Sequence, residues 1–355
     1  MNRIHNFNAG PSILPLEALN EVREEMMNFG GMSVLEISHR SKEFDAILEE
    51  TKSLVAELMK VPAGYRILFL TGGASTQFAM VPMNLMDKAA DYSITGYWSK
   101  KAVAEAKLVG EVRTAFTSES EKFSRCPKAD EIKLSDGASY LHITTNNTIY
   151  GTEYHEFPNS GNTPLVADMS SDIMSRELDV SKFGVIYAGA QKNIGPAGVT
   201  LVLIREDLAA RSYRPLPTML KYTTHVENNS LFNTPPVFAI YVTRSVLRWI
   251  KRSGGIAAIE KANRKKAALI YDAIDRSNLY KGTAAKDSRS LMNITFTLPS
   301  DELTEKFIAE SKSKGMVGLK GHRALGGVRA STYNALPIES AMALAEFMAE
   351  FEKKA

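Results

Sequence analysis

The chain has 355 residues, of which 44% are hydrophobic and 23% charged, an ordinary globular composition with room for about two domains. Its 43 basic and 40 acidic residues leave a net charge of +3, too close to balance to indicate a nucleic-acid-binding protein. A single cysteine, Cys126, excludes a disulfide framework, and no apolar run approaches the roughly 18 residues that a membrane-spanning helix needs. The N-terminus lacks the apolar segment of a signal peptide, so we expect a soluble protein in a reducing compartment, the cytoplasm.

The first third of the chain alternates helical and strand-like patterns. In chain order, the apolar spacing predicts an extended arm (1–15), two helices (16–29 and 41–60), a strand (67–70), a helix from about Ser75, an apolar run (92–99) and a helix (100–110).

The middle of the chain contains several short apolar strands. The pattern predicts strands within 138–151, ending at Asp168, and over 183–191 and 198–207. Because these strands lack strict alternation of apolar and polar residues, we predict a largely parallel sheet that is buried on both faces.

The last third changes character after a long helical stretch, 236–277, that is broken at Gly254-Gly255. A compact unit then follows, with a strand (291–298), a helix (302–315), a strand (326–336) and a terminal helix (337–355). We therefore predict a large domain over 16–255 and a small C-terminal domain over 256–355. The one basic cluster, Arg264–Lys266, lies in a helical pattern, and we expect it to be a solvated helix face.

A glycine turn, Gly72-Gly73, joins the strand 67–70 to the next helix and is followed by Ala74, Ser75 and Thr76. A strand that ends in glycines and opens a helix directs main-chain N–H groups and the helix dipole at one point, which is typical of a phosphate site. The stretch matches neither the dinucleotide-binding glycine pattern nor a Walker loop. On its own it is equally typical of a tight turn whose Ser or Thr caps the helix.

Two further residues stand at strand ends. Asp168 ends the strand "PLVAD", where α/β sheets present functional groups, although it could also cap the following segment. Lys192 follows the next apolar strand, within "YAGAQKNIGPAG". A lysine in a desolvated site has a lowered pKa, and its neutral amine can form a Schiff base with an aldehyde. A surface hairpin lysine is the alternative.

Together, the glycine turn, Asp168 and Lys192 suit one ligand, pyridoxal 5′-phosphate. It needs an N–H-rich helix start for its phosphate, a carboxylate for its ring nitrogen and a lysine for its aldehyde. Trp98, one of only two tryptophans, offers an aromatic ring for stacking, or it is an ordinary core residue. No metal site is predicted.

The sequence resembles the phosphoserine aminotransferase family, within the class-V aminotransferases and the fold-type-I pyridoxal-phosphate enzymes. The resemblance runs nearly from end to end, through "FNAGPSILP", "LEISHRSKEF", "LFLTGGASTQF", "ADMSSDIMSR", "YAGAQKNIGPAG", "FNTPPVFAIY" and "GHRALGGVRASTYNAL". It implies an α/β fold whose large domain has a mostly parallel seven-stranded sheet between helices, joined to a small α/β C-terminal domain.

The resemblance also implies a role for each matching residue in cofactor binding. Lys192 would carry the cofactor, Asp168 would pair with its ring nitrogen, and Trp98 would stack on the ring. Its phosphate would be held by Ala74, Ser75 and Gln191, and Thr148 would lie near its ring hydroxyl. Asn233 and Thr234 would reach the cofactor phosphate of a second subunit, so that the active unit is a homodimer.

Two His-Arg pairs, His39-Arg40 and His322-Arg323, together with Arg329, form a candidate substrate site. Arginine binds carboxylate and phosphate with two parallel hydrogen bonds, so several cations suit a substrate with two anionic ends. By resemblance, Arg329 takes the α-carboxylate and the two pairs take the substrate phosphate; an isolated pair would otherwise be a surface salt bridge. The glycine turn lacks the arginine that some family members carry there, which removes one cation from this site.

The reaction implied by the resemblance moves the amino group of L-glutamate to 3-phosphohydroxypyruvate, giving O-phospho-L-serine and 2-oxoglutarate in serine biosynthesis. Family members often also accept the phosphorylated keto acid of pyridoxine biosynthesis, whose product is 4-phosphohydroxy-L-threonine. One alternative is a transaminase or lyase of the alanine–glyoxylate type, which would not need two His-Arg pairs. Another is a non-catalytic pyridoxal-phosphate-binding protein, which would lack Lys192 or carry an added domain.

Overall fold

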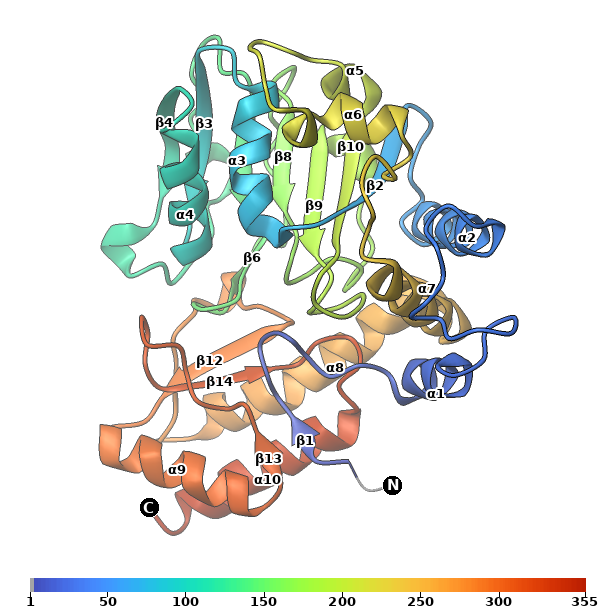
Figure 1. Ribbon diagram of the computed structural model, residues 1–355. Helices are drawn as coiled ribbons and strands as arrows, with labels where there is room; N and C mark the ends of the chain where they lie inside the picture. Colours follow the sequence, from blue (N-terminus) through green and yellow to red (C-terminus); the bar gives the residue numbers. More distant parts are fainter. Residues whose placement is uncertain (1–2) are drawn as a thin grey trace.

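The computed structural model describes residues 3–355, which build a seven-stranded sheet with a smaller α/β layer beneath it (Figure 1). Across the large sheet the strand order is β2 (Tyr65–Leu70), β10 (Thr200–Arg205), β9 (Val185–Gly189), β8 (Leu165–Asp168), β5 (Leu141–Thr144), β3 (Ala89–Ile94) and β4 (Glu111–Thr117). Only β10 runs antiparallel to its neighbours, and all other pairs are parallel. The prediction of a mostly parallel sheet is confirmed.

Helices cover both faces of this sheet. One face packs against α3 (Gly73–Leu85), α4 (Tyr97–Ala106), α5 (Glu206–Ala209) and α6 (Tyr222–Glu227), and the other against α1 (Leu16–Glu25), α2 (Lys42–Leu58) and α7 (Val237–Arg252). In β9, for example, Tyr187 packs in the first layer while Ile186 and Ala188 pack in the second. Burial on both sides is why the strands are apolar throughout.

The small domain is the lower layer of Figure 1. It consists of α8 (Gly255–Arg276), β11 (Lys281–Gly282), β12 (Asn293–Thr297), α9 (Asp301–Ser313), β13 (Met316–Val317), β14 (Val328–Ser331) and α10 (Ile338–Glu352). Strands β11, β12 and β14 form an antiparallel sheet. The first half of α8 contributes Ile256 and Ile259 to the core of the large domain, and its second half packs in the small-domain core, so α8 connects the two layers.

The N-terminal arm belongs to the small domain in space. Its strand β1 (His5–Asn6) pairs in parallel with β13, and Phe7 and Ile13 are buried in the small-domain core. The remaining short elements are β6 (Asn146–Asn147), β7 (Thr152–Glu153) and 3₁₀ turns at Glu119–Glu121, Ala129–Glu131, Val180–Lys182, Thr218–Leu220 and Lys286–Ser288.

Several element boundaries differ from the predictions. The apolar run 92–99 is not one strand, because β3 ends at Ile94 and α4 begins at Tyr97. The Ser99 hydroxyl accepts hydrogen bonds from the N–H groups of Thr95 and Gly96, at 3.0 Å each, and so caps the start of α4. Trp98 therefore lies in the first turn of a helix.

Two other element boundaries were predicted wrongly, and one strand was not predicted. The first helix ends at Glu25 rather than 29, the strand expected over 326–336 is confined to Val328–Ser331, and β4 was missed. Strand β4 is an edge strand whose charged residues, Glu111 and Arg113, are not buried, so it lacks the apolar pattern of the central strands.

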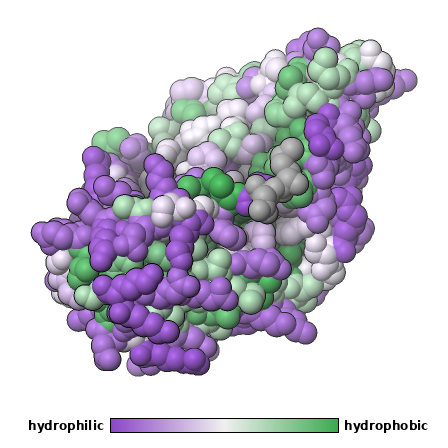
Figure 2. Space-filling model, turned by 90° about the horizontal axis from the view of Figure 1, so that it is seen from below, coloured by the Kyte–Doolittle hydropathy of each residue, from purple (hydrophilic) through white to green (hydrophobic). Residues whose placement is uncertain are grey.

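The surface seen from below in Figure 2 is mostly hydrophilic, with smaller apolar areas between the charged side chains. Within residues 3–355, no helix combines the length and the apolar character needed to cross a membrane.

Candidate active site

The carboxyl ends of β8 and β9 bring Asp168 and Lys192 to one edge of the large sheet. The two strands are parallel neighbours, with Asp168 aligned to Tyr187, and Lys192 follows the end of β9 by three residues. The Asp168 carboxylate acts on the Lys192 ammonium through space, since it raises the pKa of Lys192. Parallel strand order thus joins two residues that are far apart in the sequence.

Lys192 lies in a desolvated environment. Its Nζ donates a hydrogen bond to Thr148 Oγ1 at 2.7 Å. Burial lowers the pKa of Lys192 to about 8, the Asp168 carboxylate opposes this shift, and the Arg329 guanidinium adds to it. A substantial fraction of neutral amine therefore exists near neutral pH, as a nucleophile or a proton acceptor requires.

The Lys192 loop is held by both the N-terminal arm and the small domain. The Ser12 N–H donates to the Gln191 carbonyl at 2.9 Å, and the Ser12 hydroxyl donates to the Lys192 carbonyl. On the other side, the Asn193 side chain donates to the Ile173 carbonyl at 3.1 Å. Asn193 Oδ1 also accepts the Asn334 N–H at 3.1 Å. The lysine backbone is therefore fixed from three segments of the chain.

Asp168 is almost completely buried, with 4% of its surface exposed. Its Oδ1 accepts the Ser170 N–H at 2.9 Å, which orients the carboxyl group. Burial raises the pKa of Asp168, and the hydrogen bonds from Ser170 and the nearby Lys192 charge oppose that shift. A buried carboxylate of this kind requires a cationic partner.

The start of α3 has the geometry of an anion site. Gly72 adopts a left-handed backbone, with φ of 86°, and the first amide to bond back within the turn is that of Thr76, to the Gly72 carbonyl. The N–H groups of residues 73–75 precede it and have no partner of their own within the helix. Ala74 and Ser75 thus lie at a helix N-terminus that favours negative charge.

Gln191 lies two residues beyond the end of β9, and Trp98 lies in the first turn of α4. A Cβ atom on Gly189 would come within 2.7 Å of Gln191 Oε1, so the glycine allows the Gln191 side chain to lie close to the strand end. The Trp98 ring packs edge-on against Tyr97, with 5.1 Å between centroids. Trp98 Nε1 is buried and has no hydrogen-bond partner among the residues that the structure describes.

Arg329, on β14, reaches from the small domain toward Lys192. Its Nη1 donates to the Thr148 carbonyl at 3.5 Å, so Thr148 contacts both cationic side chains. The Arg329 Nε is buried without a partner in the described part of the chain, and burial lowers the pKa of the guanidinium. An unpaired, desolvated guanidinium suits a carboxylate ligand.

His322 lies on the same side as Arg329. Its ring is 5.6 Å from the ring of Tyr97, and its pKa is lowered by burial and by the charges of Arg329 and Arg323. Arg323 itself is exposed. The loop that carries His322 and Arg323 therefore borders the candidate site.

His39 and Arg40 are not brought to this cluster within one chain. They precede α2, whereas His322 contacts the start of α4, and Figure 1 shows α2 and α4 at opposite edges of the molecule. Arg40 is exposed, and no hydrogen bond or ion pair among residues 3–355 joins its side chain to the Lys192 group.

Asn233 and Thr234 precede α7 and are both exposed. Asn233 lines, with Gly72 and Thr76, a small cavity of about 140 Å³ beside the start of α3. The loop therefore lies at the surface next to the candidate phosphate site.

The donor set fits pyridoxal 5′-phosphate. The start of α3 offers N–H groups for a phosphate, and Asp168 offers a carboxylate for a protonated ring nitrogen. Two buried donors without protein partners, Trp98 Nε1 and Arg329 Nε, mark a site shaped for polar ligands.

Sequence reasoning from single motifs missed the residues that support the site. The arm residue Ser12 and the pair Asn193 and Asn334 act through hydrogen bonds that join distant segments. The only local signal was that Asn193 directly follows Lys192.

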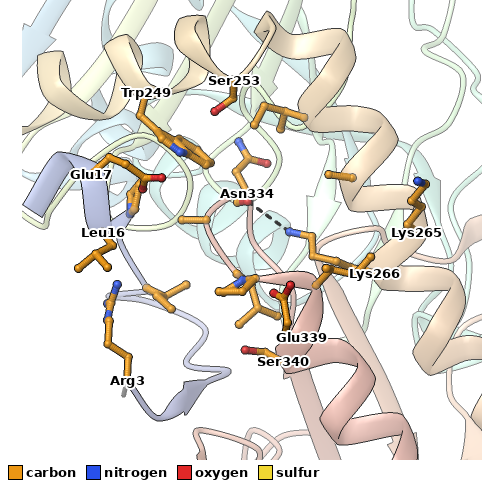
Figure 3. Close-up of a pocket in the computed structure, with 18 of the residues that line it drawn as sticks. Arg3, Leu16, Glu17, Trp249, Ser253, Lys265, Lys266, Asn334, Glu339 and Ser340 are labelled. Atoms are coloured by element: carbon orange, nitrogen blue, oxygen red, sulfur yellow. Dashed lines mark hydrogen bonds between the residues drawn. The ribbon is translucent and has the colours of Figure 1, made fainter. Parts of the chain in front are cut away.

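A separate cavity of about 820 Å³ lies between the N-terminal arm, α7, α8 and residues 334–340 (Figure 3). The figure shows Lys266 pointing toward Asn334, and its Nζ donates to the carbonyls of Tyr333 and Asn334 at 2.7 and 3.3 Å. Lys266 is 1% exposed, so the expectation of a solvated basic face is wrong for this residue, although Arg264 and Lys265 are exposed. Burial lowers the pKa of Lys266 to about 7.

This pKa predicts a pH-dependent stability. Between pH 7 and about 10, Lys266 is largely neutral in the folded chain and protonated in the unfolded chain, so the unfolded state binds more protons and stability rises with pH. The rise amounts to about 1.4 kcal/mol for each pH unit in this window. Urea unfolding of the wild type and Lys266→Met at pH 7 and pH 9.5 should show the wild type gaining stability relative to the variant. Lys265→Met is the exposed control; a wild-type-to-Lys266→Met difference that did not change with pH would contradict the assignment.

The chain was compared with known proteins. A model of the family "Aminotransferase class-V" matches residues 4–344. The phosphoserine aminotransferase of Geobacillus kaustophilus is 54% identical over 359 residues, covering 100% of this chain and 99% of the relative.

Solved structures give the same result. The phosphoserine aminotransferase from Bacillus circulans subsp. alkalophilus has a TM-score of 0.97 and 52% identity, over 99% of both chains. A pyridoxal-phosphate-bound phosphoserine aminotransferase from Trichomonas vaginalis has a TM-score of 0.93 and 39% identity, over 98% of this chain and 100% of that one. The similarity therefore covers both layers of the fold and the segments that form the candidate site.

Proposed function

The chain belongs to the class-V aminotransferase family, and from this premise we propose the roles of its site residues and its assembly. It is a pyridoxal-phosphate-dependent transaminase that transfers the amino group of L-glutamate to 3-phosphohydroxypyruvate, giving O-phospho-L-serine and 2-oxoglutarate, a step of serine biosynthesis. The observation that carries the proposed residue roles is the position of Lys192, a lysine of lowered pKa between the Asp168 carboxylate and the Arg329 guanidinium.

When bound, the cofactor supplies an aldehyde that takes up the amino group and a ring that withdraws electrons from the reacting carbon. Lys192 holds the cofactor and, when released, moves a proton at its Nζ, which its lowered pKa permits near neutral pH. Asp168 keeps the ring nitrogen protonated, because a buried carboxylate is stabilised by a cation. The start of α3 with Ala74 and Ser75, together with Gln191, binds the phosphate.

Trp98 would stack on the ring, and Thr148 would lie near its hydroxyl group. Arg329 orients each substrate through its α-carboxylate, as the unpaired Nε of this guanidinium suggests. The His-Arg pairs bind the second anionic group of the substrate, and the absence of an arginine in the glycine turn leaves this task to them.

The direct test is glutamate-dependent amination of 3-phosphohydroxypyruvate by the purified enzyme. We expect turnover with this keto acid and a yellow protein that loses its colour when glutamate is added. Turnover with glyoxylate or pyruvate but none with the phosphorylated keto acid would instead favour a transaminase of the alanine–glyoxylate type.

We infer that the active unit is a homodimer, in which Asn233 and Thr234 reach the partner's cofactor phosphate. Two observations support this. The loop around Asn233 is exposed beside the start of α3, and Phe232 next to it is 45% exposed, so this loop presents an apolar ring that a second subunit could cover. The His39-Arg40 pair precedes α2, whereas His322 contacts the start of α4, and Figure 1 shows these two helices at opposite edges of the molecule. A second subunit is therefore the simplest way to bring both His-Arg pairs to one substrate.

Replacing Arg40 with alanine is expected to raise the KM for 3-phosphohydroxypyruvate about 10- to 100-fold, because a hydrogen bond to a charged group contributes about 1.5–3 kcal/mol. The KM for glutamate, which carries no phosphate, should change less. Steady-state kinetics with each substrate measures both effects. Equal increases for the two substrates would argue against a role at the phosphate.

Mixed dimers test which subunit Arg40 serves. A chain with Lys192→Ala is combined with a chain with Arg40→Ala by unfolding and refolding them together. If Arg40 serves the partner's site, the mixed dimer has one site with both residues intact and regains low KM. If Arg40 serves its own chain, no site is intact and the low-KM activity stays absent.

We also propose that the enzyme accepts the phosphorylated keto acid of the pyridoxine pathway, because the same two cationic clusters suit any short keto acid with a phosphate.

A cytoplasmic location is proposed from the single cysteine, Cys126, which is buried and free.

A further inference from the structure

One hydroxyl group behind the active site faces two hydrogen-bond acceptors. Thr145, which follows β5, has its Oγ1 3.0 Å from the main-chain oxygen of Asp168 and 2.5 Å from Oδ1 of Asp172. A threonine hydroxyl carries a single hydrogen and can donate it in one direction only. The Asp168 carbonyl also accepts the Thr145 N–H at 3.0 Å, so it is paired in either case. If the hydroxyl donates to this carbonyl, the short contact with Asp172 needs a hydrogen from the opposite side. The Asp168 carbonyl has none, whereas Asp172 has one when it is a carboxylic acid.

The surroundings of Asp172 disfavour a second negative charge. Asp172 is 3% exposed and Glu153 is fully buried. The Arg176 guanidinium is the nearest cation, but its Nε lies 3.1 Å from Glu153, and its closest approach to Asp172 is 4.0 Å. Arg176 also donates to the carbonyls of Tyr154 and His155. One guanidinium, already occupied by Glu153, cannot balance two buried carboxylates.

Charges on the other packed segments act on Asp172 in both directions. The titratable groups that act electrostatically on Asp172 are Cys126, Glu153, Asp168, Arg176, Lys192 and Tyr333. Burial and the Glu153 carboxylate raise the pKa of Asp172 to about 7, against the opposing effects of Arg176 and of the hydrogen bond with Thr145. Ionised Asp172 would add a third carboxylate to a region whose cations are Arg176, which pairs with Glu153, and Lys192, on which Asp168 acts more strongly than Asp172 does.

We propose that Asp172 is a positioning residue that keeps its proton and donates it to Thr145, so that Thr145 donates in turn to the main-chain oxygen of Asp168. The chain of hydrogen bonds then runs in one direction and satisfies every member. It fixes the backbone of Asp168 at the end of β8 and leaves Asp168 as the single anion offered to the ring nitrogen. The inference rests on the proposed function, because it concerns the residue that pairs with the cofactor.

The protonation state is tested first on the enzyme without cofactor. The infrared difference spectrum between wild type and Asp172→Asn at pH 6 should show the loss of a C=O stretch of a protonated carboxylic acid. Loss of carboxylate bands alone would overturn the proposal. This measurement does not depend on turnover, so it separates a failure of this inference from a failure of the proposed function, which wild-type turnover tests.

The positioning role is tested on the holoenzyme with four variants. Asp172→Asn keeps a donor without charge, so kcat should stay within about twofold and the pH midpoint of cofactor absorbance should not move. Asp172→Ala and Thr145→Val break the chain, and kcat should fall about tenfold with little change in the KM for glutamate. Thr51→Val removes an equally buried threonine hydroxyl on α2 and should change none of these values.

The proposal is overturned if Asp172→Asn lowers kcat as much as Asp172→Ala, or if it shifts the absorbance midpoint downward by a pH unit, as removal of a nearby anion would. If Thr145→Val does not fold, Thr145→Ser, which keeps the hydroxyl, should still match the wild type in kcat and midpoint, and a tenfold loss in that variant would also count against the hydrogen-bond chain.

Discussion

Replacing Lys192 with alanine is expected to lower kcat for transamination by about 10⁴-fold or more. In the proposed mechanism the side chain both holds the cofactor and moves the proton, and loss of general acid–base catalysis alone costs about 10²- to 10⁴-fold. Burial lowers the pKa of this lysine to about 8, so part of its amine is neutral near neutral pH and can accept a proton. Single-turnover absorbance changes of the bound cofactor with glutamate measure the effect directly.

A matched control for this substitution is Lys52→Met. Lys52 also has a pKa lowered by burial, but it lies on α2 and contacts Glu49 and Asn229 rather than the site. This variant should retain wild-type kcat. A Lys192→Ala enzyme that still interconverted the two cofactor forms at the wild-type rate would rule out the proposed role.

The second large effect is expected for Asp168→Asn, which should reduce kcat about 10²- to 10⁴-fold. Removing one member of a buried ion pair costs about 3–5 kcal/mol, and each 1.36 kcal/mol corresponds to a tenfold change in rate. The amide keeps the size of the side chain and the hydrogen bond from the Ser170 N–H, so the decrease in kcat reports the effect of the lost negative charge alone. Cofactor affinity should fall as well, measured by the absorbance of the protein after dialysis.

Asp91→Asn is the matched control for Asp168→Asn. Asp91 is fully buried on β3 and accepts the Ser135 N–H at 2.6 Å, away from Lys192. We expect its substitution to affect stability but not kcat. Equal losses of kcat in the two variants would mean that the effect at Asp168 is structural.

The arm and the small domain both contact the segment that carries the lysine, and the small domain also carries Arg329, the proposed substrate-binding residue. Arg329 is on β14, and the Asn334 N–H, three residues beyond that strand, holds Asn193 next to Lys192. A ligand that orders Arg329 therefore acts on the same segment that fixes Lys192. This arrangement gives a physical reason for the two layers of the fold: each half of the site is anchored in a different core.

The sequence alone was sufficient for the class of fold. Apolar runs buried on both faces predicted a parallel sheet, and the break at Gly254-Gly255 separates α7 from α8 as expected. Asp168 and Lys192 could be identified as candidates because functional groups gather at the carboxyl ends of parallel strands. These patterns are local and periodic, so they can be recognised in the sequence without knowledge of the tertiary structure.

Other features depend on contacts between segments that are distant in the sequence. A helix begins inside the apolar run 92–99, where the Ser99 side chain in its first turn accepts the N–H of the N-cap residue Gly96. The edge position of β4 left this strand without the apolar pattern of the central strands. Lys266 appeared as one of three basic residues on a helix, but packing against residues 333–334 buries it. Its burial depends on the segment that packs against it, and the helical pattern of α8 carries no information about that segment.

The chemistry of the site divides in the same way. Residue type and strand position made Lys192 and Asp168 visible in the sequence, because their charges are out of place at the ends of apolar strands. The lowered pKa of Lys192, the remoteness of His39-Arg40 and the hydrogen-bond chain through Thr145 and Asp172 arise from desolvation and from contacts between distant segments. Such effects depend on distance and burial rather than on order along the chain, so only the tertiary structure could decide them.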